Sequence, residues 1–86
     1  MLSSADKKKW EAANANFNND DSKANLAALV AAAKTADHWK TIYNRADYMG
    51  EKATAQAAHT AWIQFPTVGD KVMDYIYDML PDWAKG

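Results

Sequence analysis

A stripe of small residues through the middle of the chain constrains the fold most. Ala46, Gly50, Ala53 and Ala57 recur at intervals of four, three and four, the spacing that brings residues to one face of an α-helix. Apolar residues, all but Ala61 larger than those of the stripe, extend it on both sides: Trp39, Ile42, Tyr43, Ala61, Trp62 and Phe65. The stripe predicts helical structure and, because small side chains allow close approach, a surface against which another helix packs.

The composition supports an all-α fold. Alanine, the strongest helix former, is the commonest residue, whereas Val and Ile, which favour strands, are scarce. A chain of 86 residues has room for one domain with a modest core. We therefore expect a single helical domain over residues 1–86, a small bundle of about four helices with one long central helix.

Capping patterns predict the bounds of the first helix. Ser3 is followed three residues later by Asp6, a pairing typical of a helix N-terminus. Residues 14–21 are rich in Asn and Asp, whose side chains compete for backbone hydrogen bonds. The first helix is therefore expected to end near Phe17.

The next two helices also have recognisable starts. Asp21 or Ser22 can cap a second helix over about residues 23–34. Thr35 can cap a third, in which the helical pattern continues over residues 36–64. No capping residue follows Gly50, so one uninterrupted helix is the favoured interpretation, with a break at Gly50 as the alternative.

A final helix is expected after a proline. Phe65 precedes Pro66, and the residue before proline is disfavoured in helical geometry, so the long helix should end there. Thr67 and Asp70 form a second capping box, which opens a helix to about Leu80. Its inward face is expected to contain Val68, Val72, Ile76, Met79 and Leu80.

Charge and cysteine content exclude several classes of protein. The formal net charge is −1, from 10 basic and 11 acidic residues, so no overall field steers the chain toward nucleic acid or an anionic membrane. The absence of cysteine excludes disulfides and thiolate zinc sites. There is no secretory signal pattern, and the longest apolar run, residues 26–33, is too short to span a membrane. We expect a soluble protein, cytoplasmic or virion-associated, that binds neither nucleic acid nor membrane.

No combination of residues indicates catalysis, a metal or a cofactor. His38 and His59 are the only histidines, and neither has further ligands at zinc-site spacing. A calcium-loop register starting at Asn16 has Asp21 where glycine is needed and Ala27 where glutamate is needed. There is also no glycine-rich phosphate loop and no nucleophile elbow. The sequence predicts a non-enzymatic protein without a cofactor.

A DNA-binding helix-turn-helix is a weaker alternative for the middle of the chain. Ala46 and Gly50 stand at the separation that the motif requires. Polar residues then stand where apolar anchors belong: Glu51, Gln56 and His59. The recognition helix would carry only Lys52 as a base, too little for phosphate contacts. An ordinary packed helix is the favoured interpretation.

Aspartates recur every four residues near the end of the chain: Asp70, Asp74, Asp78 and Asp82. Like charges at this spacing repel one another on a helix, and the flanking Tyr75 and Tyr77 belong to a residue type favoured at interfaces. Two interpretations remain open: a solvated face that aids solubility, or a surface that binds a basic partner.

The opening segment, residues 2–13 (LSSADKKKWEAA), resembles a short helical segment of bacteriophage tail-fibre and appendage proteins, in which an Ala-Asp-Lys turn leads into a Lys-Trp-Asp/Glu-Ala helix. The resemblance implies a phage or prophage origin and a structural role, and it brings no catalytic residues.

We expect the chain to act through contacts with a partner protein or with copies of itself. The leading hypothesis is a phage-derived assembly or accessory protein that holds a partner helix through six residues: Ala46, Gly50, Ala53, Ala57, Trp62 and Phe65. The alternative is a small regulator or inhibitor that binds a basic protein surface through an acidic face: Asp70, Asp74, Tyr75 and Asp78. The stripe of small residues has a further interpretation, in which it packs inside the monomer.

Overall fold

The structure is a computed structural model that describes residues 2–85. This range contains five α-helices and two 3₁₀ turns. The helices are α1 (Ser4–Asn19), α2 (Lys23–Ala32), α3 (Ala36–Tyr48), α4 (Lys52–Val68) and α5 (Met73–Met79). The 3₁₀ turns are η1 (Gly69–Val72) and η2 (Asp82–Ala84). No strand occurs within the described range, so the predicted all-α fold is confirmed. Residues 1 and 86, which the single-domain prediction includes, lie outside that range.

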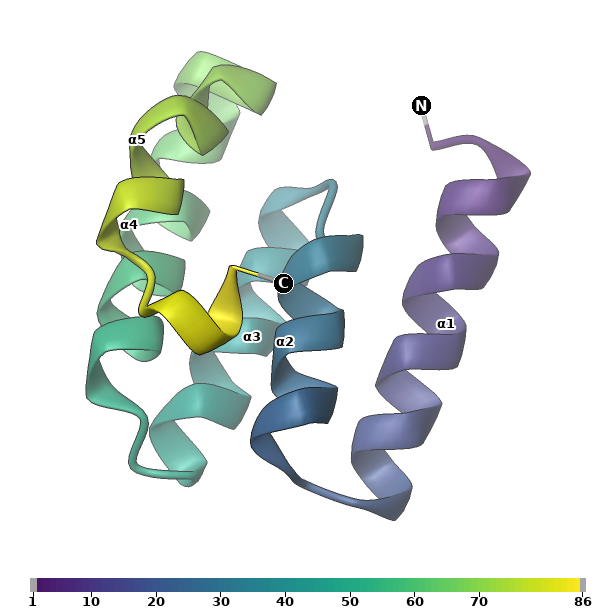
Figure 1. The fold of residues 1–86 in the computed structure, drawn as a ribbon. Coiled ribbons are helices and arrows are strands. Elements are labelled where there is room, and N and C mark those ends of the chain that lie inside the picture. The colour runs from purple at the N-terminus through teal and green to yellow at the C-terminus, as the bar shows by residue number, and fades with distance from the viewer. Residues whose placement is uncertain (1, 86) are drawn as a thin grey trace.

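Consecutive long helices run in alternating directions (Figure 1). α3 and α4 form the most extensive pair, α1 packs against α2, and η2 returns across the bundle to contact α2. α4, η1 and α5 follow one another without an extended residue from position 52 to position 79. This helical segment is the longest in the described chain, and α5 folds back beside α4 (Figure 1).

The three predicted helix starts are confirmed. Ser3, Ser22 and Thr35 are the N-caps of α1, α2 and α3. The side-chain oxygen of each accepts a hydrogen bond from the backbone N–H three residues later, at 3.1, 3.2 and 3.0 Å. Each bond satisfies a donor that the first turn of a helix leaves free. Short-range chemistry therefore determines where these helices begin.

α1 ends at Asn19, two residues beyond the predicted end near Phe17 and within the Asn- and Asp-rich stretch. Phe17 is only 4% exposed, and burying its ring outweighs the low helix propensity of the surrounding Asn residues. The helix ends at Asp20, whose N–H bonds to the carbonyls of residues 16 and 17 at 2.9 and 3.2 Å. Asn25 Nδ2 donates to the carbonyls of residues 16 and 20 and fixes the turn into α2.

The predicted uninterrupted helix over residues 36–64 is wrong. The chain reverses at Gly50, whose φ is +75°. Glu51 N–H bonds to the Ala46 carbonyl at 2.9 Å, and Gly50 N–H bonds to the Asp47 carbonyl at 3.0 Å. This pair of bonds is the Schellman motif, which ends a helix with glycine in the left-handed conformation. The result is a hairpin of α3 and α4, so the alternative break at Gly50 is confirmed.

The helix end predicted at Phe65–Pro66 is wrong as well, because Pro66 lies inside α4, which continues to Val68. Pro66 is close to the C-terminus of the helix, and its missing N–H removes one hydrogen bond there. Gly69, with φ of +58°, ends α4. The capping box predicted for Thr67 is therefore absent, since that residue is helical.

The inward face predicted for the last segment is only partly correct. Val72, Ile76 and Leu80 are buried, whereas Val68 and Met79 are 37% and 40% exposed. The η1 turn has about three residues per turn instead of 3.6, so the apolar positions before and after it do not share one face. The remaining core comes mainly from α2 and α3, with Leu26, Leu29, Trp39 and Ile42 fully buried.

Candidate interaction face on α4 and α5

The stripe of small residues that the sequence placed on one helix face does not form. Ala46 and Ala57 are fully buried, whereas Gly50 and Ala53 are exposed at the turn between α3 and α4. The reversal at Gly50 breaks the helical register on which the stripe depends. Ala46 and Ala57 contribute to the core, which agrees with the interpretation that small residues pack inside the monomer.

Trp62 and Phe65, the other two residues predicted to hold a partner helix, are half-buried against the core. The Trp62 ring lies 5.8 Å from the His59 ring, edge to face, and 6.1 Å from the Tyr43 ring. Lys40 Nζ lies 5.4 Å from the Trp62 ring centroid, a favourable cation–π distance. Trp62 is therefore engaged in an aromatic cluster between α3 and α4.

Exposed apolar side chains gather in one segment instead. Six large hydrophobic residues are exposed within residues 2–85, and five of them fall in positions 63–79: Ile63, Val68, Tyr75, Tyr77 and Met79. Ile63 is the most exposed of these five, at 58%. Singly exposed apolar residues are normal, and this segment holds most of those in the described chain.

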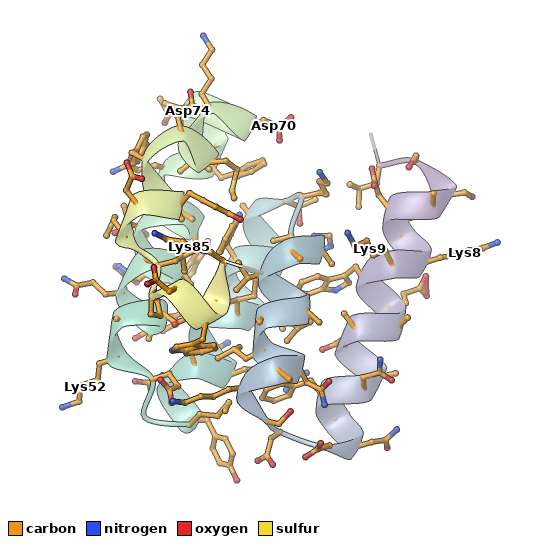
Figure 2. All side chains as sticks on the ribbon, in the orientation of Figure 1. Lys8, Lys9, Lys52, Asp70, Asp74 and Lys85 are labelled. Atoms are coloured by element: carbon orange, nitrogen blue, oxygen red, sulfur yellow. The ribbon has the colours of Figure 1, made fainter. Side chains whose placement is uncertain are left out.

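Acidic side chains lie among these apolar residues. Asp70 on η1 and Asp74 and Asp78 on α5 are exposed, and Figure 2 shows Asp70 and Asp74 extending from the end of the molecule at which α4 and α5 meet. Asp74 and Asp78 are four residues apart on α5, as are Tyr75 and Met79, so the two pairs form adjacent rows. None of the three aspartates forms an ion pair within the described chain.

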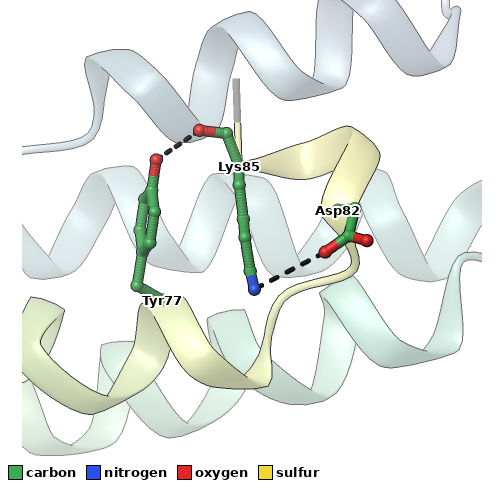
Figure 3. A network of polar contacts seen from close by, with 3 residues as sticks. All are labelled: Tyr77, Asp82 and Lys85. Atoms are coloured by element: carbon green, nitrogen blue, oxygen red, sulfur yellow. Dashed lines mark hydrogen bonds and ion pairs between the residues drawn. The ribbon is translucent and has the colours of Figure 1, made fainter.

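Asp82 differs from the other three aspartates, because it lies on η2 and pairs with Lys85. The two charged groups are 3.7 Å apart, and Figure 3 shows this contact. The structure therefore separates Asp82 from the predicted strip. We refer to the remaining surface as the α4–α5 face, defined by Ile63, Val68, Asp70, Asp74, Tyr75, Asp78 and Met79.

Two tyrosine hydroxyls hold this part of the molecule together. Tyr75 donates a hydrogen bond to Gln64 Oε1 and joins α5 to α4. Tyr77 donates to the carbonyl oxygen of Lys85 and joins α5 to the segment after η2 (Figure 3). Both rings remain partly exposed, at 38% and 44%. Because their hydroxyls are fixed, the exposed rings are positioned before any partner arrives.

His38 lies apart from this face, where α1 meets the α2–α3 turn. Its ring stacks on Trp10 with centroids 3.9 Å apart and an interplanar angle of 13°. His38 Nδ1 accepts a hydrogen bond from the Lys34 N–H at 2.9 Å, so this nitrogen carries no proton. Burial lowers the pKa of His38, and the nearby Asp37 carboxylate opposes the shift. His38 therefore acts as a neutral structural residue.

Residues 2–85 contain no cluster of three or more His, Cys, Asp or Glu side chains placed to hold a metal ion. Within the same range, no helix combines the length and apolar character that a membrane crossing requires.

The sequence identified Asp70, Asp74, Tyr75 and Asp78 and missed Ile63, Val68 and Met79. Apolar residues at helical spacing from Ile76 are ordinarily core residues, so their pattern gave no sign of exposure. The available signal was Gly69, which favours a change of backbone direction and hence of the exposed face. Comparisons with protein-family models, curated proteins and solved structures found no match.

Proposed function

We propose that this chain is a non-enzymatic interaction or assembly protein that binds a partner protein through the α4–α5 face. The proposal rests on one observation: of the six exposed large hydrophobics in the described chain, four belong to this face, namely Ile63, Val68, Tyr75 and Met79. An interface needs an apolar centre with a polar rim, and this face offers both kinds of side chain.

The charges on the face indicate the chemistry of the partner. Asp70, Asp74 and Asp78 are exposed and have no cationic partner in the described chain. A partner with Lys or Arg around an apolar patch would relieve the repulsion between Asp74 and Asp78 and cover the exposed Tyr75 ring. This proposal combines the predicted acidic face with exposed apolar residues and no longer uses the stripe of small residues.

The resemblance of residues 2–13 to phage appendage segments supports an accessory role in a phage or prophage, in the cytoplasm or in an assembled particle. That setting requires no catalytic residue. Light scattering over a range of concentrations would report whether the partner is a second copy. A mass above that of one chain, reduced to that mass by Tyr75→Ala, would identify the partner as this same protein.

Calorimetric titration with a probe peptide tests the face. The probe is a helical peptide of Lys and Leu with one basic side and one apolar side, the helix type that grooves and faces bind in protein recognition. We expect saturable binding that Asp74→Asn with Asp78→Asn weakens about tenfold. Binding should also weaken when salt screens the exposed charges.

A matched variant controls for the loss of two negative charges. Glu11 and Asp47 are exposed and lie outside the α4–α5 face, so Glu11→Gln with Asp47→Asn should change the affinity by less than about twofold. Equal weakening by both double variants would mean that the peptide responds only to net charge, and the proposed face would be rejected. Absence of binding to the unmodified protein would also reject it.

A further inference from the structure

A groove of about 420 Å³ lies where the last turn of α1 meets the last turn of α3. It is on a different part of the molecule from the α4–α5 face, and its polar lining comes from six residues: Asn18, Asn19, Asp21, Asn44, Arg45 and Tyr48. The volume is within the range of small-molecule sites in proteins. Neither the core nor the proposed interaction accounts for this set of side chains.

The amides of the groove are exposed and lie at helix ends. Asn18 and Asn19 are the last two residues of α1, and Asn44 is near the end of α3. Within residues 2–85, the side chains of Asn18, Asn19 and Asn44 form no hydrogen bond. Free amides of this kind offer both donors and acceptors to a ligand.

Arg45, the chain's single arginine, lines the groove and contacts two residues of α1. Its Nη2 donates to Asn14 Oδ1 at 2.8 Å, and its guanidinium carbon lies 5.0 Å from the Phe17 ring centroid. No carboxylate pairs with it in the described chain. Fixed donors recognise a ligand at a lower entropic cost than mobile ones.

The electrostatics of the groove favour an uncharged ligand. α1 and α3 both end there, and the C-terminal ends of helices carry partial negative charge. This charge and the Asp21 carboxylate disfavour a phosphate or a carboxylate, whereas Arg45 disfavours a cation. The remaining class is a neutral molecule with many hydrogen-bonding groups.

Tyr48 adds an aromatic wall. Its side chain is 78% exposed, the most exposed large hydrophobic residue in the described chain. An aromatic ring offers an apolar surface, while amides and carboxylates beside it can bond to adjacent hydroxyl groups. We propose that this groove binds a saccharide, with the sugar ring against Tyr48 and its hydroxyls on Asn44, Asn18 and Asp21.

Amide chemical shifts of the ¹⁵N-labelled full chain test the proposal. The probes are glucose, galactose, mannose and N-acetylglucosamine, together with maltotriose and chitotriose, each added to high millimolar concentration. At least one of them should cause saturable shifts confined to residues 17–21 and 44–48. Tyr48→Ala and Asn44→Ala should each raise the Kd about tenfold. Gln56→Ala, which removes an exposed amide on α4, should leave the Kd unchanged.

Two results would overturn the proposal. One is the absence of saturable shifts in the groove with every saccharide. The other is inorganic phosphate causing the same shifts as tightly as the best saccharide, which would assign the groove to anions. Neither result affects peptide binding at the α4–α5 face, so the two proposals fail independently.

Discussion

Replacing Gly50 with alanine discriminates sharply between the hairpin and a continuous helix. In the structure Gly50 has a φ of +75°, and a Cβ added there would meet no atom within 4 Å. The effect is therefore a backbone effect with no steric clash. An L-residue in the left-handed conformation costs about 1–2 kcal/mol, and the lower entropy of unfolded alanine offsets about 0.4–1 kcal/mol of that.

The expected result for Gly50→Ala is destabilisation by about 1 kcal/mol, which lowers the Tm of a domain of this size by about 4–8 °C. In an uninterrupted helix the same substitution would stabilise by about 0.8–1 kcal/mol. Urea and thermal unfolding followed by circular dichroism measure the difference. A synthetic chain with D-alanine at this position is the control, because it fits the left-handed conformation and should be stabilised. A Gly50→Ala protein more stable than the unmodified chain would refute the turn.

Three further predictions concern stability. Ala57→Leu should destabilise the protein by about 1–3 kcal/mol by overpacking, because Ala57 is fully buried. The control is Ala53→Leu at the exposed turn, which should change the free energy of unfolding by less than about 0.5 kcal/mol. Thr54→Val should stabilise by about 1 kcal/mol in urea unfolding, because Thr54 Oγ1 is buried and has no hydrogen-bond partner in residues 2–85. Burial lowers the pKa of His38 below its ordinary 6.5, so as the pH falls the unfolded chain binds a proton before the folded chain does. The contribution of His38 to the free energy of unfolding is therefore fully present above about pH 6.5 and decreases as the pH falls below it. Urea titrations at about pH 7.5 and about pH 5 measure how much stability is lost between the two pH values, and His38→Gln should reduce that loss. An unchanged pH dependence in the variant would contradict the attribution of the loss to His38.

Features that depend on neighbouring residues could be predicted from the sequence. Ser3, Ser22 and Thr35 cap their helices as expected, because each side chain bonds to a backbone group three residues away. The all-α class was also predictable, since the alanine-rich composition provides little material for strands. The exposed aspartates of α5 were identified because their four-residue spacing is preserved within one helix.

Features that depend on tertiary structure could not be predicted in this way. Gly50 is compatible with a packed helix and with a Schellman turn, and the choice depends on α3 and α4 burying Ala46 and Ala57 between antiparallel neighbours. Phe17 extends α1 through a stretch with low helix propensity because its ring is buried. Val68 and Met79 are exposed although they lie at helical spacing from the buried Val72 and Ile76, and no local pattern specifies this difference. The groove lined by Asn44 and Tyr48 depends on α1 and α3 ending side by side.

Mapping the contact surface tests the central proposal most directly. The ¹⁵N-labelled chain is titrated with the basic amphipathic peptide, and amide shifts are followed for every residue. The proposal predicts that the saturable shifts lie within residues 63–79 and that the Asp74→Asn, Asp78→Asn variant needs about tenfold more peptide to reach saturation. Shifts centred elsewhere, or shifts in positions 63–79 that saturate at the same peptide concentration in that variant, would contradict it.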